Sequence, residues 1–155
     1  MRPENPVTAA RDAIENLLHT YAERIDAGDF AGVGELFADA AILGPDGRPI
    51  ARGAAETQRL YEKTTRRYED GTPRTRHVTS NLILEVNEAA GEASGRCTYV
   101  VFQSLEGFPL QPIVSGRYHD QFIRNNSRWH FHERRMFVDA TGDLSRHLHI
   151  ELPPS

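Results

Sequence analysis

The chain has 155 residues, of which 39% are hydrophobic and 26% charged, a composition that fits one globular domain with its own core. Its net charge of −4 argues against a main role in binding the nucleic-acid backbone. The single cysteine excludes an internal disulfide bond, and no apolar run approaches the roughly 18 residues of a membrane span, so we expect one cytoplasmic domain over residues 1–155 that binds no membrane.

Helical patterns fill the first half of the chain. A stripe of apolar residues three or four apart predicts an amphipathic first helix that ends near Gly28. The stripe consists of Ile14, Leu17, Leu18, Tyr21 and Ile25. Asp29 is expected to cap a short second helix, and residues 41–43 and 49–52 to be short extended segments on either side of a turn. A third helix is predicted over about residues 54–68.

From Arg74 onward the pattern alternates, as it does in strands. Four long strands are predicted, over residues 76–86, 92–104, 112–124 and 128–138. Their short connections suit successive hairpins, so the sheet should be mostly antiparallel. Helices followed by such a meander indicate the α+β class. The chain from about residue 142 is polar and rich in histidine, and we expect it to form a loose tail.

The second long strand is apolar on both faces. Tyr99 and Val101 alternate there with Val100 and Phe102. A sheet covered by its own helices on one face only should be wetter on the other. The pattern therefore predicts that the outer face binds another subunit, and we expect a homo-oligomer, either a dimer or a trimer.

The first long strand leaves the direction of one histidine open. Strict alternation gives one face to Val78, Leu82, Leu84 and Val86. His77 would then lie on the opposite face. It enters the domain only if that opposite face looks inward, or if a bulge near residues 79–80 changes the alternation.

Asp26 and Tyr21 lie one helical turn apart in the first helix. Asp26 lies about 120° from the middle of the apolar stripe, in the last turn. A carboxylate there opposes the negative end of the helix dipole, so either it is an ordinary exposed residue or a partner compensates it. Tyr21 lies within the stripe, and a buried hydroxyl needs a hydrogen-bond partner.

Motifs for metals and common cofactors are weak or missing. His130 with His132, and His147 with His149, have the spacing that points two ligands to the same side of a strand. A metal centre needs a third ligand, and none can be placed, so structural or solvated histidines are the preferred interpretation and no metal is expected. The sequence has no Walker loop and no dinucleotide fingerprint, so no cofactor is expected either.

Several motifs, taken in order along the chain, resemble the SnoaL-like branch of the NTF2-like superfamily over about residues 9–139. They are Tyr21, Arg24-Ile25-Asp26, the segment from Asp29-Phe30 to Leu36-Phe37-Ala38-Asp39, Thr75-Arg76-His77, Gly116-Arg117-Tyr118-His119-Asp120 and Trp129-His130-Phe131. The resemblance implies a cone in which a curved, mostly antiparallel sheet wraps around the helices, with an apolar pocket at its open end. Relatives with this fold include scytalone dehydratase, dehydrochlorinases, bile-acid dehydratase, polyketide cyclases and small subunits of ring-hydroxylating dioxygenases.

The resemblance also implies a site. In the dehydratase-like members an aspartate late in the first helix pairs with a histidine at the start of the first long strand, and Asp26 and His77 match those positions. Tyr21 matches a tyrosine one turn earlier. The implied activity is that of a cofactor-independent lyase or isomerase acting on a small hydrophobic molecule, steroid-like or polycyclic. His77 would be the base, Asp26 would hold its ring, and Tyr21 or Tyr99 would donate a proton.

Three residues are expected to contact the substrate. Phe37 and Tyr99 would wall the pocket, and Arg135 would orient a polar end of the substrate unless it is a surface or interface residue. Some relatives carry a further acid or histidine on the second long strand, and residues 92–104 offer none in their middle, which leaves the general acid unidentified. The alternative is a non-catalytic protein, either a small-molecule-binding module or an accessory subunit of a ring-hydroxylating oxygenase.

Overall fold

Three helices and six strands make up residues 5–152, which are the residues that the structure, a computed structural model, describes. In chain order they are α1 Pro6–Asp26, α2 Phe30–Leu36, β1 Ala41–Leu43, β2 Pro49–Arg52, α3 Gly53–Thr64, β3 Thr75–Asn87, β4 Glu92–Leu105, β5 Phe108–Asn125 and β6 Arg128–Thr141. The strands form one sheet in the order β2-β1-β6-β5-β4-β3, and the β1–β6 pair is parallel while its other pairs are antiparallel. The predicted α+β class and mostly antiparallel sheet are confirmed. None of the described helices has an apolar stretch long enough to cross a membrane.

The helix ends follow local signals, with one exception. α1 begins at Pro6 because the Asn5 side chain caps it, accepting a hydrogen bond from the Val7 amide at 3.1 Å. Asp29 caps α2 as predicted and accepts from the Gly32 amide at 2.8 Å. α3 ends at Thr64, four residues earlier than predicted, because the chain after it leaves the helix to pair with the C-terminal segment.

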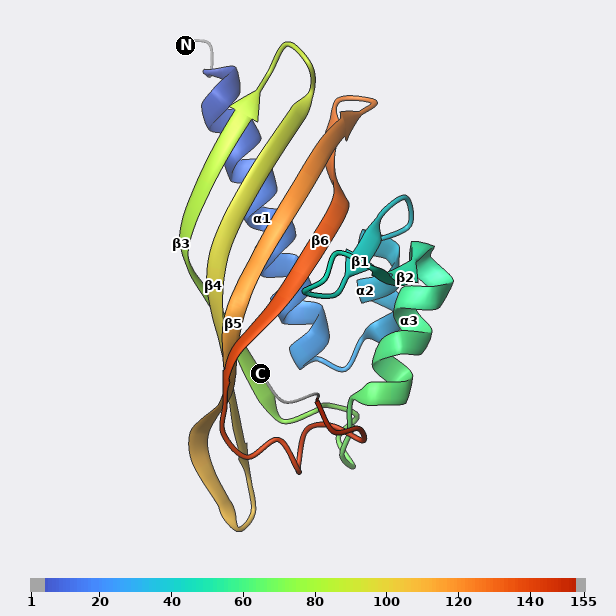
Figure 1. Cartoon of the computed structure of the whole chain (residues 1–155), viewed down its shortest axis with the longest axis vertical. Coiled ribbons are helices and arrows are strands. Elements are labelled where there is room, and N and C mark those ends of the chain that lie inside the picture. Colours follow the sequence, from blue (N-terminus) through green and yellow to red (C-terminus); the bar gives the residue numbers. More distant parts are fainter. Residues whose placement is uncertain (1–4, 153–155) are drawn as a thin grey trace.

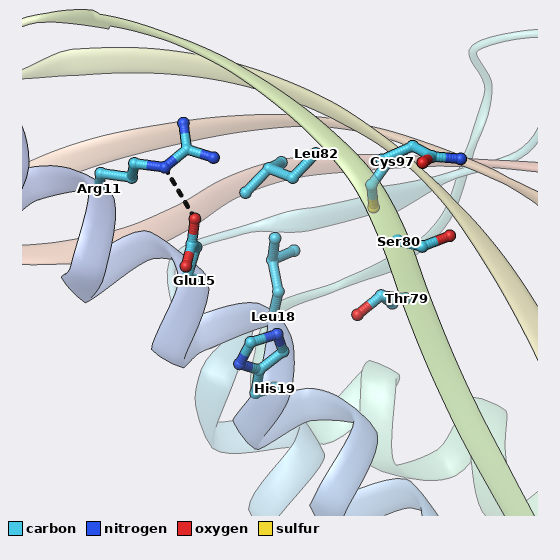
Figure 2. A pocket seen from close by; sticks show the side chains of 9 residues that line it. Arg11, Glu15, Leu18, His19, Thr79, Ser80, Leu82 and Cys97 are labelled. Atoms are coloured by element: carbon cyan, nitrogen blue, oxygen red, sulfur yellow. Dashed lines mark ion pairs between the residues drawn. The ribbon is translucent and has the colours of Figure 1, made fainter.

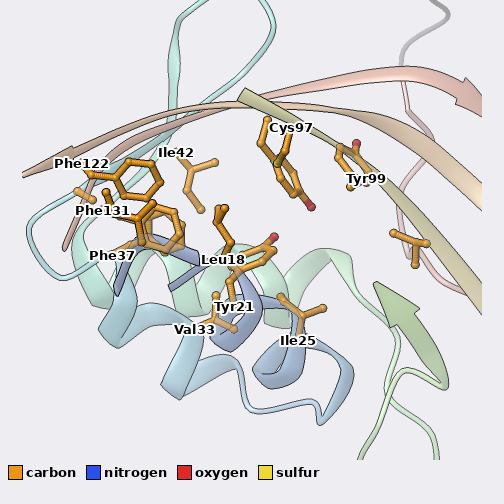
Figure 3. Packing of buried hydrophobic residues seen from close by; sticks show 14 of the residues in the cluster. Leu18, Tyr21, Ile25, Val33, Phe37, Ile42, Cys97, Tyr99, Phe122 and Phe131 are labelled. Carbon is orange, nitrogen blue, oxygen red and sulfur yellow. The ribbon is translucent and has the colours of Figure 1, made fainter. Parts of the chain in front are cut away.

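The core lies between α1 and the concave face of the sheet. Figure 1 shows α1 running along the four long strands, with α2, α3 and the two short strands at one side. Side chains of α1 and of the strands meet in this space, and many of them are aromatic (Figure 3). Ile14, Leu18, Tyr21 and Ile25 of the predicted stripe are each no more than 3% exposed. The hydrophobic periodicity of α1 therefore predicted its buried face correctly.

A bulge in β3 turns His77 toward the core. Ser80 pairs with Thr98 and Ile83 with Arg96, so β3 carries one extra residue between them. Asn81 absorbs it in the left-handed conformation, at φ 58°, which asparagine tolerates better than most residues. Val78 is consequently exposed, whereas Leu82 packs against the core. The prediction that Val78 and Leu82 share a face was wrong, and the bulge considered as an alternative is present one to two residues later.

A second bulge, in β6, reverses the expected faces of two arginines. Gln121 pairs with Glu133 and Phe122 with Phe131, which leaves His132 as the extra residue. Alternation from Phe131 would point Arg135 inward, but the bulge shifts every later side chain to the other face. Arg134 is therefore fully buried in the core.

The chain beyond Thr141 folds back onto the domain. The Gly142 amide donates to the Ile113 carbonyl at 2.8 Å, and Leu148 forms an isolated bridge with Thr65. His147 is only 7% exposed. The expectation of a loose tail from about residue 142 was wrong for residues 142–149, because main-chain hydrogen bonds, which leave no hydrophobic pattern, hold this polar segment in place.

Candidate active site

Asp26 and His77, 51 residues apart in sequence, form a buried pair. Asp26 ends α1 and His77 is the third residue of β3. The His77 Nδ1 lies 2.6 Å from the Asp26 Oδ1, and the two side chains are only 8% and 9% exposed. The structure thus brings together the two residues that the family resemblance singled out.

Two further donors compensate the carboxylate at the end of α1. The Thr75 hydroxyl donates to Asp26 Oδ1 at 2.8 Å, and the His77 main-chain amide donates to Oδ2 at 2.8 Å. With the His77 ring, three donors surround a side chain that the helix dipole alone would disfavour as an anion. Thr75 was not among the predicted site residues, although it stands in the quoted motif Thr75-Arg76-His77.

The pairing fixes the chemistry available to the His77 ring. An ionised carboxylate only accepts hydrogen bonds, so we infer that Nδ1 carries the proton that is shared with Asp26. The lone pair is then on Nε2. A neutral imidazole in this tautomer can take a proton from a substrate, and the carboxylate stabilises the imidazolium that forms.

Tyr21 lies beside the pair and can act as a proton donor. Its ring meets the His77 ring edge to face, with ring centroids 6.4 Å apart. Its hydroxyl lies 2.7 Å from the hydroxyl of Tyr61 on α3. Burial raises the pKa of Tyr21, while the nearby Arg134 charge works in the opposite direction. The phenol is therefore protonated at neutral pH, with a cation close enough to stabilise it if it loses the proton.

Phe37 and Tyr99, expected to wall a pocket, are buried in the aromatic core (Figure 3). Phe37 stacks on Phe131 with ring centroids 4.8 Å apart and meets Tyr21 edge to face at 6.1 Å. The Tyr99 hydroxyl donates to the Phe137 carbonyl at 2.9 Å, passing over Gly116, where a Cβ atom would come within 2.7 Å of it. Tyr21 is thus the better candidate for a proton donor, because the Tyr99 hydroxyl gives its hydrogen to a main-chain carbonyl, whereas in the Tyr21–Tyr61 pair either hydroxyl can be the donor.

Arg135 does not lie at this site. It donates to the Pro45 carbonyl in the turn between β1 and β2, and its guanidinium lies over the Phe137 ring on the outer face. The arginine beside Tyr21 is Arg134, whose guanidinium carbon is 4.4 Å from the centre of the Tyr21 ring. The bulge in β6 explains why Arg134 and not Arg135 lies beside Tyr21, and the local sequence around His132 contains no signal that predicts this bulge.

Arg134 belongs to a buried ion pair with Asp120. Its Nε and Nη2 each donate to an Asp120 carboxylate oxygen at 2.8 Å, and the two side chains are 0% and 2% exposed. Burial alone would lower the pKa of Arg134, but the charge and hydrogen bonds of Asp120 outweigh burial and raise it. A permanent positive charge therefore lies beneath the Tyr21 ring, in an environment where charges interact strongly.

Two cavities open along the α1–β3 side of the domain. One, of about 270 Å³, lies between α1 and β3 and is lined by Arg11, Glu15, Leu18, His19, Thr79, Ser80, Asn81, Leu82 and Cys97 (Figure 2). The other, of about 520 Å³, includes Asp26 and Thr75 in its lining. Asp26 can therefore be approached from the second cavity, while His77 lines neither of the two.

Neither a metal nor a reactive cysteine is evident in the described part of the chain. Within residues 5–152 no group of three or more His, Cys, Asp or Glu side chains is arranged to hold a metal ion. Burial raises the pKa of the Cys97 thiol to about 11, so the thiol is protonated and a poor nucleophile at neutral pH.

Comparison with known proteins gives a family and a fold. The family model described as SnoaL-like domain matches residues 6–135. Among similar solved structures is an Asp-to-Asn variant of a protein of unknown function from Mycobacterium tuberculosis, 26% identical with a TM-score of 0.69, covering 87% of this chain and 76% of that one. A proposed scytalone dehydratase from Novosphingobium aromaticivorans is 20% identical with a TM-score of 0.70, covering 89% of each chain.

A third similar structure is described as one subunit of a proposed enzyme. It is the beta subunit of a proposed aromatic-ring-hydroxylating dioxygenase from Novosphingobium aromaticivorans, 17% identical with a TM-score of 0.68, covering 89% of this chain and 94% of that one. No curated protein sequence matches the chain significantly. The neighbours share a fold and differ in described function, so the residues of the site must carry the functional argument.

Proposed function

The chain belongs to the family of SnoaL-like domains, and we propose that it is a cofactor-independent lyase or isomerase that resembles the dehydratases in its chemistry. Its substrate would be a small hydrophobic molecule, of steroid-like or polycyclic shape. The observation that carries the proposal is the buried pair of Asp26 Oδ1 and His77 Nδ1 at 2.6 Å, which leaves the His77 Nε2 as a base.

The first step would be common to elimination, dehydration and double-bond isomerisation. His77 Nε2 takes a proton from a carbon next to an activating group, and Asp26 stabilises the resulting imidazolium. In a dehydration the carbon–oxygen bond then breaks, and Tyr21 gives its proton to the departing hydroxyl, which leaves as water. The proton on His77 afterwards returns to Tyr21. Burial raises the pKa of Tyr21, and the charge of Arg134 opposes that rise, so Arg134 stabilises the transient tyrosinate.

The surroundings of Tyr21 support a hydrophobic substrate. Phe37 and Tyr118 meet its ring edge to face, with centroids 6.1 and 6.0 Å away. Ligand sites of small molecules are mostly apolar with a few polar groups, which is the composition of this part of the core. We also propose that Phe37 and Tyr99 form part of the wall of the pocket that binds this substrate. The same proposal includes a cytoplasmic location for the protein.

The second candidate function is that of a non-catalytic subunit or binding module. The likeness in fold to the beta subunit of a proposed dioxygenase and the exposed apolar residues on the outer face of the sheet favour it. An accessory subunit would need a partner chain for its role and would not need the Asp26–His77 pair to titrate or react.

Measuring the exchange of a substrate proton with solvent distinguishes the enzymatic function from the non-catalytic one. The purified protein, without added cofactor, is incubated in deuterium oxide with a panel of cyclic ketones and β-hydroxyketones, and mass spectrometry follows deuterium uptake and loss of water. Proton abstraction at the carbon next to the carbonyl incorporates deuterium even where no group can leave. Uptake above the uncatalysed rate supports the lyase or isomerase, and no uptake across the panel favours the non-catalytic role.

The prediction that the protein forms a homo-oligomer through the outer face of its sheet can also be tested in solution. Val78 is 46% exposed there, directly opposite Val100 in the β3–β4 pairing, and Leu110 is 70% exposed. We expect light scattering at micromolar concentration to give the mass of a dimer or a trimer, and Val78→Glu to shift the protein toward the monomer. A wild-type protein that scatters as a monomer would exclude this interface.

A further inference from the structure

The C-terminal segment brings another histidine to the corner that contains Asp26 and His77. In Figure 1 this segment, in red, lies beside the chain that leads from α3 to β3. The Arg66 amide donates to the His147 carbonyl at 2.8 Å, and the His149 amide donates to the Thr64 carbonyl at 2.9 Å. On the other side the Gln103 Nε2 donates to the carbonyls of Arg146 and Pro73, each at 3.0 Å.

These contacts tie His147 to the start of β3. Pro73 lies two residues before Thr75, and Gln103 is the residue of β4 that pairs with Thr75. Thr75 in turn donates to Asp26. The main chain of the segment makes the anchoring bonds to the α3 end, so the His147 imidazole is not needed for them.

The imidazole of His147 is buried with an unused polar atom. The residue is 7% exposed, and its Nδ1 has no hydrogen-bond partner within residues 5–152. The Oε1 of Gln103, a fully buried residue, likewise has none in this part of the chain. A buried polar atom without a partner costs about 1–3 kcal/mol, which a hydrogen bond from a ligand would recover.

His147 is also held neutral. Burial, the largest cause, lowers the pKa of His147 to about 4, and a charge on His77 would act in the same direction while the charge of Asp26 opposes it. His147 therefore carries no charge at neutral pH. A neutral imidazole does not attract an anion, and it can donate or accept at Nδ1 according to its tautomer. A hydroxyl group matches either tautomer, since it both donates and accepts.

We propose that His147 is a substrate-binding residue, and that its Nδ1 forms a hydrogen bond with a hydroxyl group on the hydrophobic ligand. This inference rests on the function proposed above, because it places the ligand beside Asp26 and His77. It assigns the C-terminal segment a part in the site, and it narrows the ligand class to apolar ring compounds that carry a hydroxyl group.

The test uses two ligands and three proteins. 2-Naphthol and 2-methylnaphthalene have nearly the same shape and differ by a hydroxyl in place of a methyl group. His147→Asn keeps a polar atom near the position of Nδ1, whereas His147→Leu replaces it with a methyl group of similar size. Calorimetric titration at neutral pH gives six dissociation constants, and thermal unfolding shows whether each variant folds.

The wild type and His147→Asn should bind 2-naphthol about tenfold more tightly than 2-methylnaphthalene, since one buried hydrogen bond is worth about that much. His147→Leu should lose this preference. An equal preference in all three proteins, no preference in the wild type, or no binding of 2-naphthol to the wild type would each overturn the inference. Neither probe can undergo elimination, so binding of the probes is measured independently of any reaction. If the protein shows the His147-dependent preference but catalyses no proton exchange, this inference is upheld and the proposed lyase or isomerase activity is refuted.

Discussion

Asp26→Asn is expected to lower turnover by about 10²- to 10⁴-fold while leaving the fold intact. The three donors around Asp26 now face an amide that offers them a single oxygen. If the amide nitrogen faces His77, it donates to Nδ1, and the ring proton moves to Nε2, which can no longer act as a base. In addition, a neutral amide does not stabilise an imidazolium.

The matched control is Asp12→Asn, which makes the same change at an exposed position of α1 that lines neither cavity. Turnover is measured as the initial rate of deuterium uptake or of water loss, and folding by thermal unfolding. We expect Asp12→Asn to retain the wild-type rate. An Asp26→Asn protein that is folded and exchanges protons as fast as the control would show that the carboxylate has no part in the reaction.

Asp120→Ala is expected to destabilise the protein by about 3–5 kcal/mol, because it leaves the charge of Arg134 buried without its partner. Arg117 and Asp139 form a second pair of almost the same geometry, with hydrogen bonds of 2.8 and 2.9 Å, but their side chains are 42% and 43% exposed. Asp139→Ala should therefore cost only about 0–1 kcal/mol.

Urea unfolding of the two variants measures this difference directly. If Asp120→Ala does not accumulate as folded protein, the double variant Asp120→Leu/Arg134→Met removes both charges and should recover much of the stability. Equal stabilities of Asp120→Ala and Asp139→Ala would mean that burial does not set the value of these ion pairs.

The parts of the fold that could be predicted from the sequence are those with a local signal. The apolar stripe of α1 and the Asp29 cap follow from spacings of a few residues, and both are found in the structure. The side chains on each face of the long strands were harder to predict, since one extra residue moves every side chain beyond it to the opposite face of the sheet. Asn81 at φ 58° is a weak signal for the β3 bulge, and the β6 bulge at His132 has none.

The candidate site was predictable to the same uneven degree. The residues alone left Asp26 as either a surface aspartate or a partnered one, because its partner is 51 residues away, and only the family resemblance joined it to His77. Arg134 was missed because the bulge at His132 moves it to the inner face, where strict alternation from Phe131 would have placed Arg135. His147 was missed because a polar, histidine-rich segment is typical of an exposed tail, and its docking depends on main-chain contacts to residues 64–66.

The role of His77 as the base is tested most directly by the rate of deuterium uptake into a ketone that the wild type labels. His77→Gln should reduce this rate about 10³-fold or more, since it removes the only group that the mechanism uses to take the proton. His130→Gln, at an exposed position of β6, should leave the rate unchanged. A folded His77→Gln protein that labels the ketone within a few-fold of the wild-type rate would contradict the assignment of His77 as the base.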